Sequence, residues 1–126
     1  MTNKILLIDD EELVTKSLSR ALQKEGYEVR VCRSGQDAIS ETKKERPDLL
    51  ICDIRMPELN GVETINKIRE FLKNSNQRDI PEILITGYAD EDATKAAESL
   101  KVREYIYKPF DLRDFLACVK RTLAVA

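Results

Sequence analysis

Acidic residues directly follow two of the short hydrophobic runs in this sequence. Asp9 and Asp10 follow the aliphatic run 5–8, and Asp53 follows the run 49–52. Carboxylates held close together raise one another's pKa, and a hard divalent cation such as Mg²⁺ relieves the repulsion. If the two runs are neighbouring strands, these acids form a magnesium site. An Asp pair also suits a helix N-terminus, so one of Asp9 and Asp10 has a structural alternative as a cap.

A hydroxyl and an ammonium close two later strand candidates. Thr86 ends one, at 83–86, and Lys108 directly follows the other, at 104–107. Aimed at one point beside a cation, such groups stabilise charge on the oxygens of a phosphoryl group. Each residue alone is ordinary, because a threonine suits any strand and a lysine at a strand end is usually solvated. The phosphoryl-transfer interpretation therefore depends on all of these side chains meeting at one edge of a sheet.

The elements that must position these residues alternate along the chain. Continuous or alternating apolar runs predict strands over 4–8, 28–32, 49–52, 83–86 and 104–107. Apolar residues recur at helical spacing within 14–22, 38–42, 62–72, 93–100 and 112–123. Gly26 is placed to end the first helix and Asp111 to cap the last. The two more polar strands, 28–32 and 104–107, are expected near the sheet edges.

Strands that alternate with helices predict an α/β domain with a doubly wound parallel sheet. Parallel neighbours need a crossover, and right-handed crossovers place helices on both faces of the sheet. The length of 126 residues suits one domain, and no linker, repeat or low-complexity tract divides it. In such folds ligands bind beyond the carboxyl ends of the strands. The candidate residues all fall at those ends.

Composition excludes several other kinds of chemistry. The chain has no histidine, which excludes a Ser-His-Asp triad and imidazole metal ligands. A net charge of −2 lacks the basic surplus of a nucleic-acid-binding protein. The cysteines at 32, 52 and 118 form no Cys-x-x-Cys and are interpreted as core residues in a reducing compartment. No run is long enough for a signal peptide or a membrane span, so we expect a cytoplasmic protein without membrane contact.

Four motifs stand in a specific order and spacing. They are Ile-Asp-Asp-Glu-Glu at 8–12, Cys-Asp-Ile-Arg-Met-Pro-Glu-Leu-Asn-Gly at 52–61, Thr-Gly at 86–87 and Lys-Pro-Phe at 108–110. Together they resemble the receiver domain of two-component response regulators, including chemotaxis receivers, over 4–123. The resemblance implies a flavodoxin-like (βα)5 three-layer sandwich with strand order 2-1-3-4-5. It also implies that 1–126 is a single receiver domain.

The resemblance assigns the acids separate roles. Asp53 would be the phosphoacceptor, which attacks a phosphoryl group carried by a sensor histidine kinase or a phosphotransfer protein and becomes an aspartyl-phosphate. Asp10, Asp53 and the backbone carbonyl of Arg55 would bind Mg²⁺ directly, and Asp9 would bind it through water. The domain would act as a catalyst only in its own phosphorylation and dephosphorylation.

The same resemblance assigns roles beyond the acids. Thr86 and Lys108 would act with Asp53 in catalysis by binding phosphoryl oxygens, and Pro109 would follow a cis peptide bond. Thr86 and Tyr105 would form the switch, with the aromatic ring turning inward as the hydroxyl moves toward the phosphoryl group. The face built by 93–100, 104–107 and 112–123 would carry the signal to a partner, an output domain or a second copy of the chain. The family implies no direct binding of nucleic acid by this domain.

Two further positions vary within this family, the second residue after the phosphorylated Asp and the second after the Thr. Here they are Arg55 and Tyr88, both large. We hypothesise that they crowd the path of the attacking water, which predicts a long-lived phosphorylated form.

Three other functions remain open at this point. A flavin-binding domain of this fold needs a phosphate-cradling loop after the first strand, where the acids at 9–12 would repel a phosphate. A Mg²⁺-dependent phosphatase with an Asp nucleophile carries a second acid two residues later, where this chain has Arg55. A pseudo-receiver that only binds partners would need none of Asp10, Asp53, Thr86 or Lys108.

Overall fold

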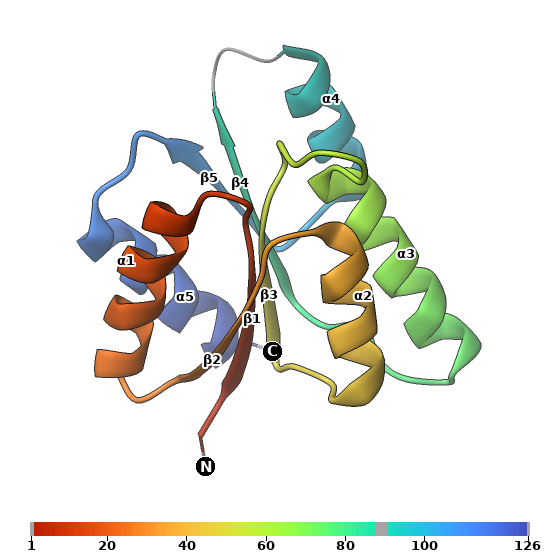
Figure 1. Ribbon diagram of the computed structural model, residues 1–126, viewed down its shortest axis with the longest axis horizontal. Coiled ribbons are helices and arrows are strands. Elements are labelled where there is room, and N and C mark those ends of the chain that lie inside the picture. The colour runs from red at the N-terminus through yellow and green to blue at the C-terminus, as the bar shows by residue number, and fades with distance from the viewer. Residues whose placement is uncertain (1, 88–90, 126) are drawn as a thin grey trace.

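The computed structural model describes residues 2–87 and 91–125, with side chains for all of these except 91–94. Within them, strands and helices alternate from end to end (Figure 1). The strands are β1 (Lys4–Ile8), β2 (Glu28–Cys32), β3 (Leu49–Asp53), β4 (Glu82–Gly87) and β5 (Glu104–Lys108). The helices are α1 (Glu12–Lys24), α2 (Gly35–Lys44), α3 (Gly61–Asn74), α4 (Glu91–Leu100) and α5 (Leu112–Ala124).

The five strands form one parallel sheet in the order β2-β1-β3-β4-β5. This confirms the doubly wound α/β fold and the predicted strand order. It also confirms that the two more polar strands, β2 and β5, lie at the edges. Every residue of β3 is buried, whereas β2 and β5 are only partly buried along most of their length.

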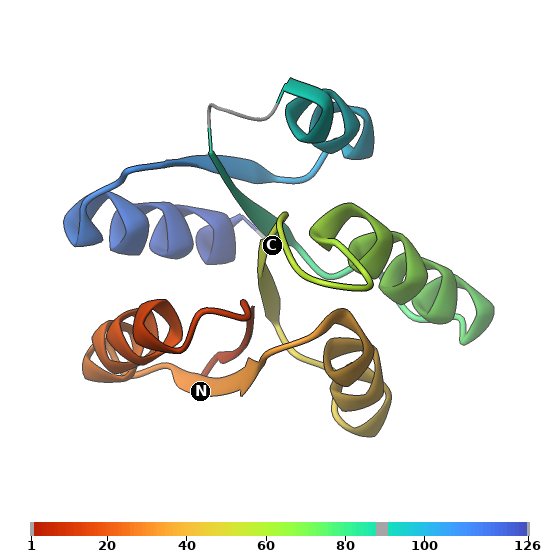
Figure 2. The same ribbon diagram turned by 45° about the horizontal axis from the view of Figure 1, so that its top comes forward.

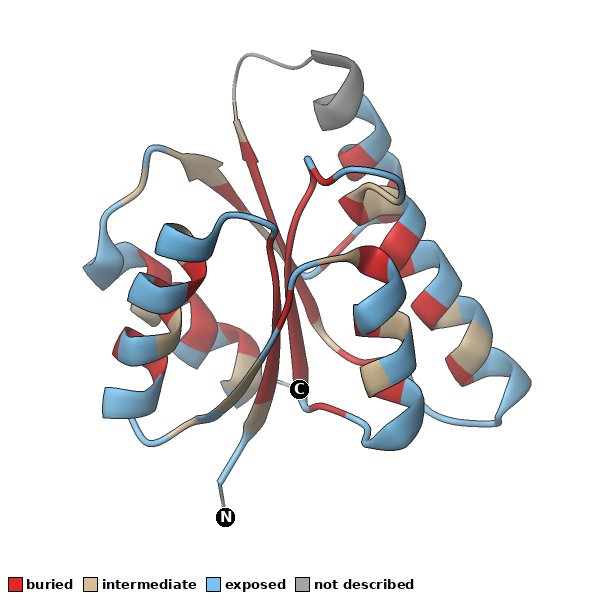
Figure 3. Ribbon diagram, viewed as in Figure 1, coloured by how far each residue is buried: buried red, intermediate tan, exposed pale blue. Residues whose placement is uncertain are grey.

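The helices cover the sheet as two outer layers, α1 and α5 on one face and α2, α3 and α4 on the other (Figure 1, Figure 2). Alternate strand residues supply two separate cores. Ile5, Leu7 and Ile51 pack under α1 and α5, and Leu6 and Leu50 pack under the opposite layer. Burying the central strands on both faces explains why their sequences are continuous aliphatic runs (Figure 3).

Local signals set several helix ends. Asp111 caps α5 by accepting a hydrogen bond from the Asp114 N–H at 2.8 Å, as its position predicted. Gly26 follows the end of α1 with φ of 92°, a conformation that glycine adopts without strain. Asn60 and Glu63 form a reciprocal capping box that starts α3 immediately after the loop that follows β3.

Helix α4 has a thin apolar contact with the sheet. The helical spacing within 93–100 predicts one apolar stripe of Ala93, Ala96, Ala97 and Leu100. Ala97 and Leu100 are buried, Ala96 is exposed, and Ala93 lies outside the residues whose side chains are described. Cys32, Cys52 and Cys118 are buried free thiols, which agrees with their interpretation as core residues. In the part of the chain that the structure describes, no helix combines the length and apolar character needed to span a lipid bilayer.

Candidate functional site

The carboxyl ends of the strands bring the predicted polar residues to one edge of the sheet. Asp9 directly follows β1, Asp53 is the last residue of β3, and Lys108 is the last residue of β5. Thr86 is the penultimate residue of β4, directly after Ile85, whose register partner is Asp53. Since β1 and β3 are neighbours, the condition on which the acidic site depended is met.

Three carboxylates meet at this edge. Oxygens of Asp9, Asp10 and Asp53 all lie within 4.8 Å of one another. Asp9 and Asp53 are buried and Asp10 is exposed, so the cluster opens to solvent on the side of Asp10. The Oδ1 atom of Asp9 accepts a hydrogen bond from the Glu11 N–H at 3.0 Å, while its buried Oδ2 has no partner among the residues that the structure describes.

The two buried acids are electrostatically unfavourable in the metal-free protein. Burial raises the pKa of Asp9 from 3.8 to about 6, against the hydrogen bond from Glu11, and the charge of Asp53 adds to the rise. Burial also raises the pKa of Asp53, although Lys108 and the Arg55 N–H oppose the effect. The site therefore contains negative charge that the protein itself only partly neutralises.

Lys108 supplies the positive charge of the site. Its Nζ lies 3.2 Å from Oδ2 of Asp53, and its side chain is about one-third exposed. Partial burial lowers the pKa of this ammonium, but the carboxylates of Asp53 and Asp9 more than offset that effect, and the net pKa is raised. The alternative of a lysine held only by solvent is therefore wrong.

Thr86 is buried on the neighbouring strand. Among the residues that the structure describes, its hydroxyl makes a single long hydrogen bond, 3.4 Å, to the carbonyl oxygen of Gly87. One residue earlier, the Ile85 carbonyl accepts a hydrogen bond from the Ile54 N–H at 3.1 Å, which ties β4 to the chain just after Asp53. The weakly held hydroxyl lies at the same sheet edge as the carboxylates.

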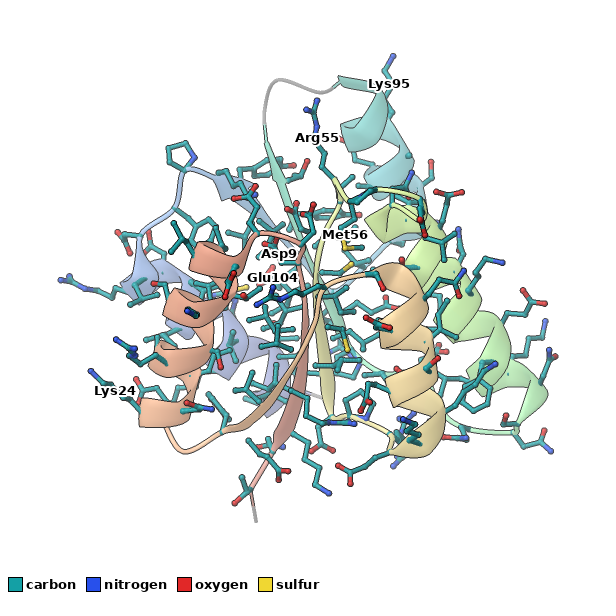
Figure 4. The ribbon with its side chains drawn as sticks, in the orientation of Figure 1. Asp9, Lys24, Arg55, Met56, Lys95 and Glu104 are labelled. Atoms are coloured by element: carbon teal, nitrogen blue, oxygen red, sulfur yellow. The ribbon has the colours of Figure 1, made fainter. Side chains whose placement is uncertain are left out.

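The loop after β3 begins at the phosphoacceptor candidate. Its Arg55 N–H lies 3.4 Å from Oδ1 of Asp53, and the Arg55 side chain is exposed between the buried Ile54 and Met56. Figure 4 shows Asp9 and Arg55 at the same end of the sheet, with Lys24 at the opposite end. On β5, the peptide bond before Pro109 is cis, as the family resemblance predicted.

The alternative role of Asp9 or Asp10 as a helix cap is not what the structure shows. The N-cap position of α1 is Glu11, and its side chain makes no capping hydrogen bond. Asp9 accepts from the N–H of Glu11, one residue before the helix. Both aspartates therefore remain available to the acidic cluster.

Tyr105 reaches from β5 to α4. Its hydroxyl donates to the carbonyl oxygen of Ala97 at 2.7 Å, and its ring is half-buried against the core on that side of the sheet. The residue proposed as a switch is thus hydrogen-bonded to α4. Tyr88, the other large residue expected near the path of water, lies outside the described residues.

Gly61, which follows the loop after β3, is a further residue of the site that no sequence pattern predicted. A Cβ on Gly61 would lie 2.5 Å from the carbonyl oxygen of Asp53 and 2.8 Å from Cα of Ile54, so only glycine fits against this backbone. The sequence pair Asn60 and Glu63 could have predicted the helix start at this point. The close approach of Gly61 to the backbone of Asp53 could not be predicted from the sequence.

The donor set fits Mg²⁺. All three acidic side chains offer hard oxygen ligands, which this ion prefers, and the orphaned Oδ2 of Asp9 is a buried polar atom that needs a partner. A divalent cation would neutralise the charge that Lys108 leaves unbalanced. The residues present are therefore compatible with a bound magnesium ion.

Comparison with known proteins agrees with this geometry. The model of the response regulator receiver domain matches residues 5–120. Sporulation initiation phosphotransferase F of Bacillus subtilis is 30% identical over 98% of this chain and 95% of its own length. A CheY-like response regulator receiver domain from Methanospirillum hungatei has a TM-score of 0.86, with 27% identity over 98% of this chain and 95% of that one.

Several relatives are longer than this chain. Transcriptional regulatory protein CrdR of Helicobacter pylori is 36% identical over 96% of this chain, which spans 55% of that protein. The first curated relatives are covered over about half of their length or less, from 25% to 55%. The likeness therefore concerns one part of those proteins.

Proposed function

The chain belongs to the response regulator receiver domain family, and from that premise we propose that Asp53 is its phosphoacceptor. Receiver domains are signalling domains of two-component systems, phosphorylated by histidine kinases or phosphotransfer proteins. We take 1–126 as one such domain. The observation that carries the assignment of Asp53 is the 3.2 Å approach of Lys108 to a buried strand-end carboxylate inside a cluster of three acids.

The proposed reaction is a transfer between two side chains. An oxygen of the Asp53 carboxylate attacks the phosphorus of a phosphohistidine, and the bond between phosphorus and the imidazole nitrogen breaks. The nitrogen keeps the bonding electron pair, and Asp53 becomes an acyl phosphate. The ammonium of Lys108 favours the ionised carboxylate before the attack and then balances charge on the phosphoryl oxygens.

We assign the cation-binding role to Asp9, Asp10, Asp53 and the backbone carbonyl of Arg55. A bound Mg²⁺ would supply Lewis-acid neutralisation of phosphoryl charge. Asp10 and Asp53 would hold it directly, and Asp9 would act through water. The Oδ2 atom of Asp9 accepts no hydrogen bond from the described residues, which supports its pairing with a water molecule bound to the cation.

Thr86 and Tyr105 are the proposed switch. In the described part of the chain the Thr86 hydroxyl makes one long hydrogen bond, so little is lost when it bonds a phosphoryl oxygen on Asp53 instead. Tyr105 connects the strand next to Thr86 with α4 through Ala97. The face formed by α4, β5 and α5 would then signal to a partner, an output domain or a second copy of the chain.

The alternative functions are not favoured. A hydrolase that acts on free phosphate esters would use a second acid two residues after its nucleophile, and the exposed Arg55 stands there. A pseudo-receiver would have no reason to hold Lys108 against Asp53 beside two further carboxylates. Chemistry confined to Asp53 makes the domain its own substrate rather than an enzyme for small molecules.

Acetyl phosphate tests the assignment without a kinase. With Mg²⁺ present, the wild-type protein is expected to take up a radiolabelled phosphoryl group that is lost on mild alkaline treatment, as an acyl phosphate is. Asp53→Asn should remain unlabelled while keeping the same circular dichroism spectrum. Labelling of Asp53→Asn at the wild-type rate would overturn the assignment, and rapid turnover of many phosphate esters would favour the hydrolase.

We further propose a sensor histidine kinase or phosphotransfer protein as the phosphodonor and the cytoplasm as the compartment. Three buried cysteines that remain free thiols support a reducing environment. The net charge of −2 supports the absence of direct nucleic-acid binding by this domain.

A further inference from the structure

Gly35, the first residue of α2, makes an unusually close contact with another part of the chain. A Cβ at this position would lie 2.1 Å from Oγ1 of Thr64 and 2.9 Å from Cβ of Leu59. Thr64 belongs to the first turn of α3, and Leu59 to the loop that follows Asp53. The start of α2 therefore touches the segment that leads away from the phosphoacceptor.

The contact leaves little freedom on the loop side. Cβ of Leu59 is bonded directly to the backbone, so no rotation of its side chain moves it away. The Thr64 side chain is buried, and its hydroxyl donates to the carbonyl oxygen of Asn60 at 2.8 Å, a bond that rotation would break. A side chain at position 35 would therefore push the loop backbone.

The far side of the loop is just as tightly packed. The N–H of Gly61 donates to the carbonyl oxygen of Ile54 at 2.8 Å, and a Cβ on Gly61 would collide with the backbone of Asp53 and Ile54. The loop 55–60 is thus confined between the end of β3 and the start of α2. It cannot yield to pressure from α2 without moving relative to Asp53.

Within this loop lies the carbonyl group that completes the proposed cation site. Arg55 stands between Ile54 and Met56, whose side chains are 3% and 9% exposed and belong to the core under α2, α3 and α4. Arg55 and Leu59 belong to the same short loop, whose ends are tied by the hydrogen bond from Gly61 to Ile54, so pressure on Leu59 acts on the segment that also holds the Arg55 carbonyl.

We propose that Gly35 is a positioning residue for the cation site: its missing side chain lets α2 hold the loop 55–60 at the distance from Asp53 at which Arg55 completes the site. This inference rests on the proposed function. Gly35 belongs to the β2–α2 unit, whereas Asp53 and Arg55 lie on β3 and in the loop after it. Gly35 would therefore affect magnesium affinity without contacting a ligand.

The test measures magnesium affinity without phosphorylation. Mg²⁺ is titrated into the metal-free full chain, and backbone amide shifts are followed by NMR for wild type, Gly35→Ala and the double variant Gly35→Ala/Thr64→Ala. We expect Gly35→Ala, which displaces the loop that carries one ligand, to raise the dissociation constant by about tenfold, the lower end of the loss seen when a group that orients a metal ligand is removed. The double variant should recover part of this loss, because it removes the Oγ1 contact and keeps that with Leu59.

Ile5→Val is the matched control for a general loss of stability. Ile5 is buried at the amino end of β1, in the other core, so this variant is expected to bind Mg²⁺ within twofold of wild type. Affinity of Gly35→Ala within twofold of wild type, or an equal loss in Ile5→Val, would overturn the proposal. If Gly35→Ala does not fold, Thr64→Ala and the double variant, which differ only at residue 35, are compared by the same criterion. Failure of wild type itself to bind Mg²⁺ would instead contradict the proposed function.

Discussion

Replacement of Asp9 by Asn is expected to stabilise the metal-free protein. Asp9 is fully buried, and no described residue donates a hydrogen bond to its Oδ2 atom. Burial raises the pKa of this carboxyl from 3.8 to about 6, and the nearby Asp53 adds to the rise. The negative charge of Asp9 therefore destabilises the fold when no cation is bound, and we expect it to be retained for cation binding.

The magnitude follows from the pKa. A change of one pKa unit corresponds to about 1.4 kcal/mol, so the ionised Asp9 destabilises the metal-free fold by about 3 kcal/mol at pH 7. The native state binds the proton more tightly than the unfolded chain, so stability from this group is present below pH 3.8 and lost as pH rises toward about 6. Asn still accepts from the Glu11 N–H but buries an unpaired amide, which reduces the expected gain to about 2 kcal/mol.

Urea unfolding in EDTA, followed by circular dichroism, measures this difference. At pH 7 Asp9→Asn should be about 2 kcal/mol more stable than wild type, and at pH 4 the advantage should largely vanish because Asp9 is then protonated in the native state. Asp10→Asn is the control, since Asp10 is exposed and its replacement should change stability by less than about 0.5 kcal/mol. No gain in stability for Asp9→Asn at pH 7, or an equal gain at pH 4, would show that ionised Asp9 does not destabilise the fold.

Three further substitutions test other contacts. Arg69→Met removes the hydrogen bonds of 2.5 and 2.9 Å to Glu82, a buried carboxylate whose pKa is raised by burial. In urea unfolding this variant should be less stable than wild type by about 3 kcal/mol at pH 7, and by less at pH 4, where Glu82 can be protonated. An equal loss at both pH values would contradict this. Tyr105→Phe removes the hydrogen bond to the Ala97 carbonyl oxygen, so amide hydrogen exchange within residues 95–100 of α4 should become several-fold faster and the free energy of unfolding should fall by about 1 kcal/mol. Unchanged exchange would show that the hydroxyl does not stabilise the helix. Arg55→Asn should shorten the lifetime of the phosphorylated protein several-fold by opening the path of water, and an unchanged rate of phosphate release would exclude that role.

Much of the fold follows from local patterns. The aliphatic runs in β1 and β3 predict strands covered on both faces, and the more polar β2 and β5 predict edges, as found. Asp111 and Gly26 predict helix ends because capping and a positive φ depend on one or two neighbouring residues. Ala96 was assigned wrongly to the buried stripe of α4, because a short alanine-rich helix specifies its inner face only weakly.

The composition of the candidate site was also predictable, because parallel strands bring their carboxyl ends to one edge. Its energetics were not. The sequence left two roles open for the Asp9–Asp10 pair, a helix cap and a cation ligand. The choice depends on where the carboxylates lie relative to Glu11 and Asp53, which only the folded chain sets. The 3.2 Å approach of Lys108 to Asp53 likewise joins residues 55 positions apart.

The sequence by itself determined which chemistry this protein can hold, since it places acids, a hydroxyl and an ammonium at strand ends and provides the alternating elements that align them. Only the tertiary structure decided that Asp9 is buried with an unpaired oxygen, that Lys108 pairs with Asp53, and that Gly35 packs against the loop after Asp53. The physical reason is that periodicity and capping act over a few residues. Desolvation, ion pairing and steric contact depend instead on distances between segments that only the packed sheet and helices set.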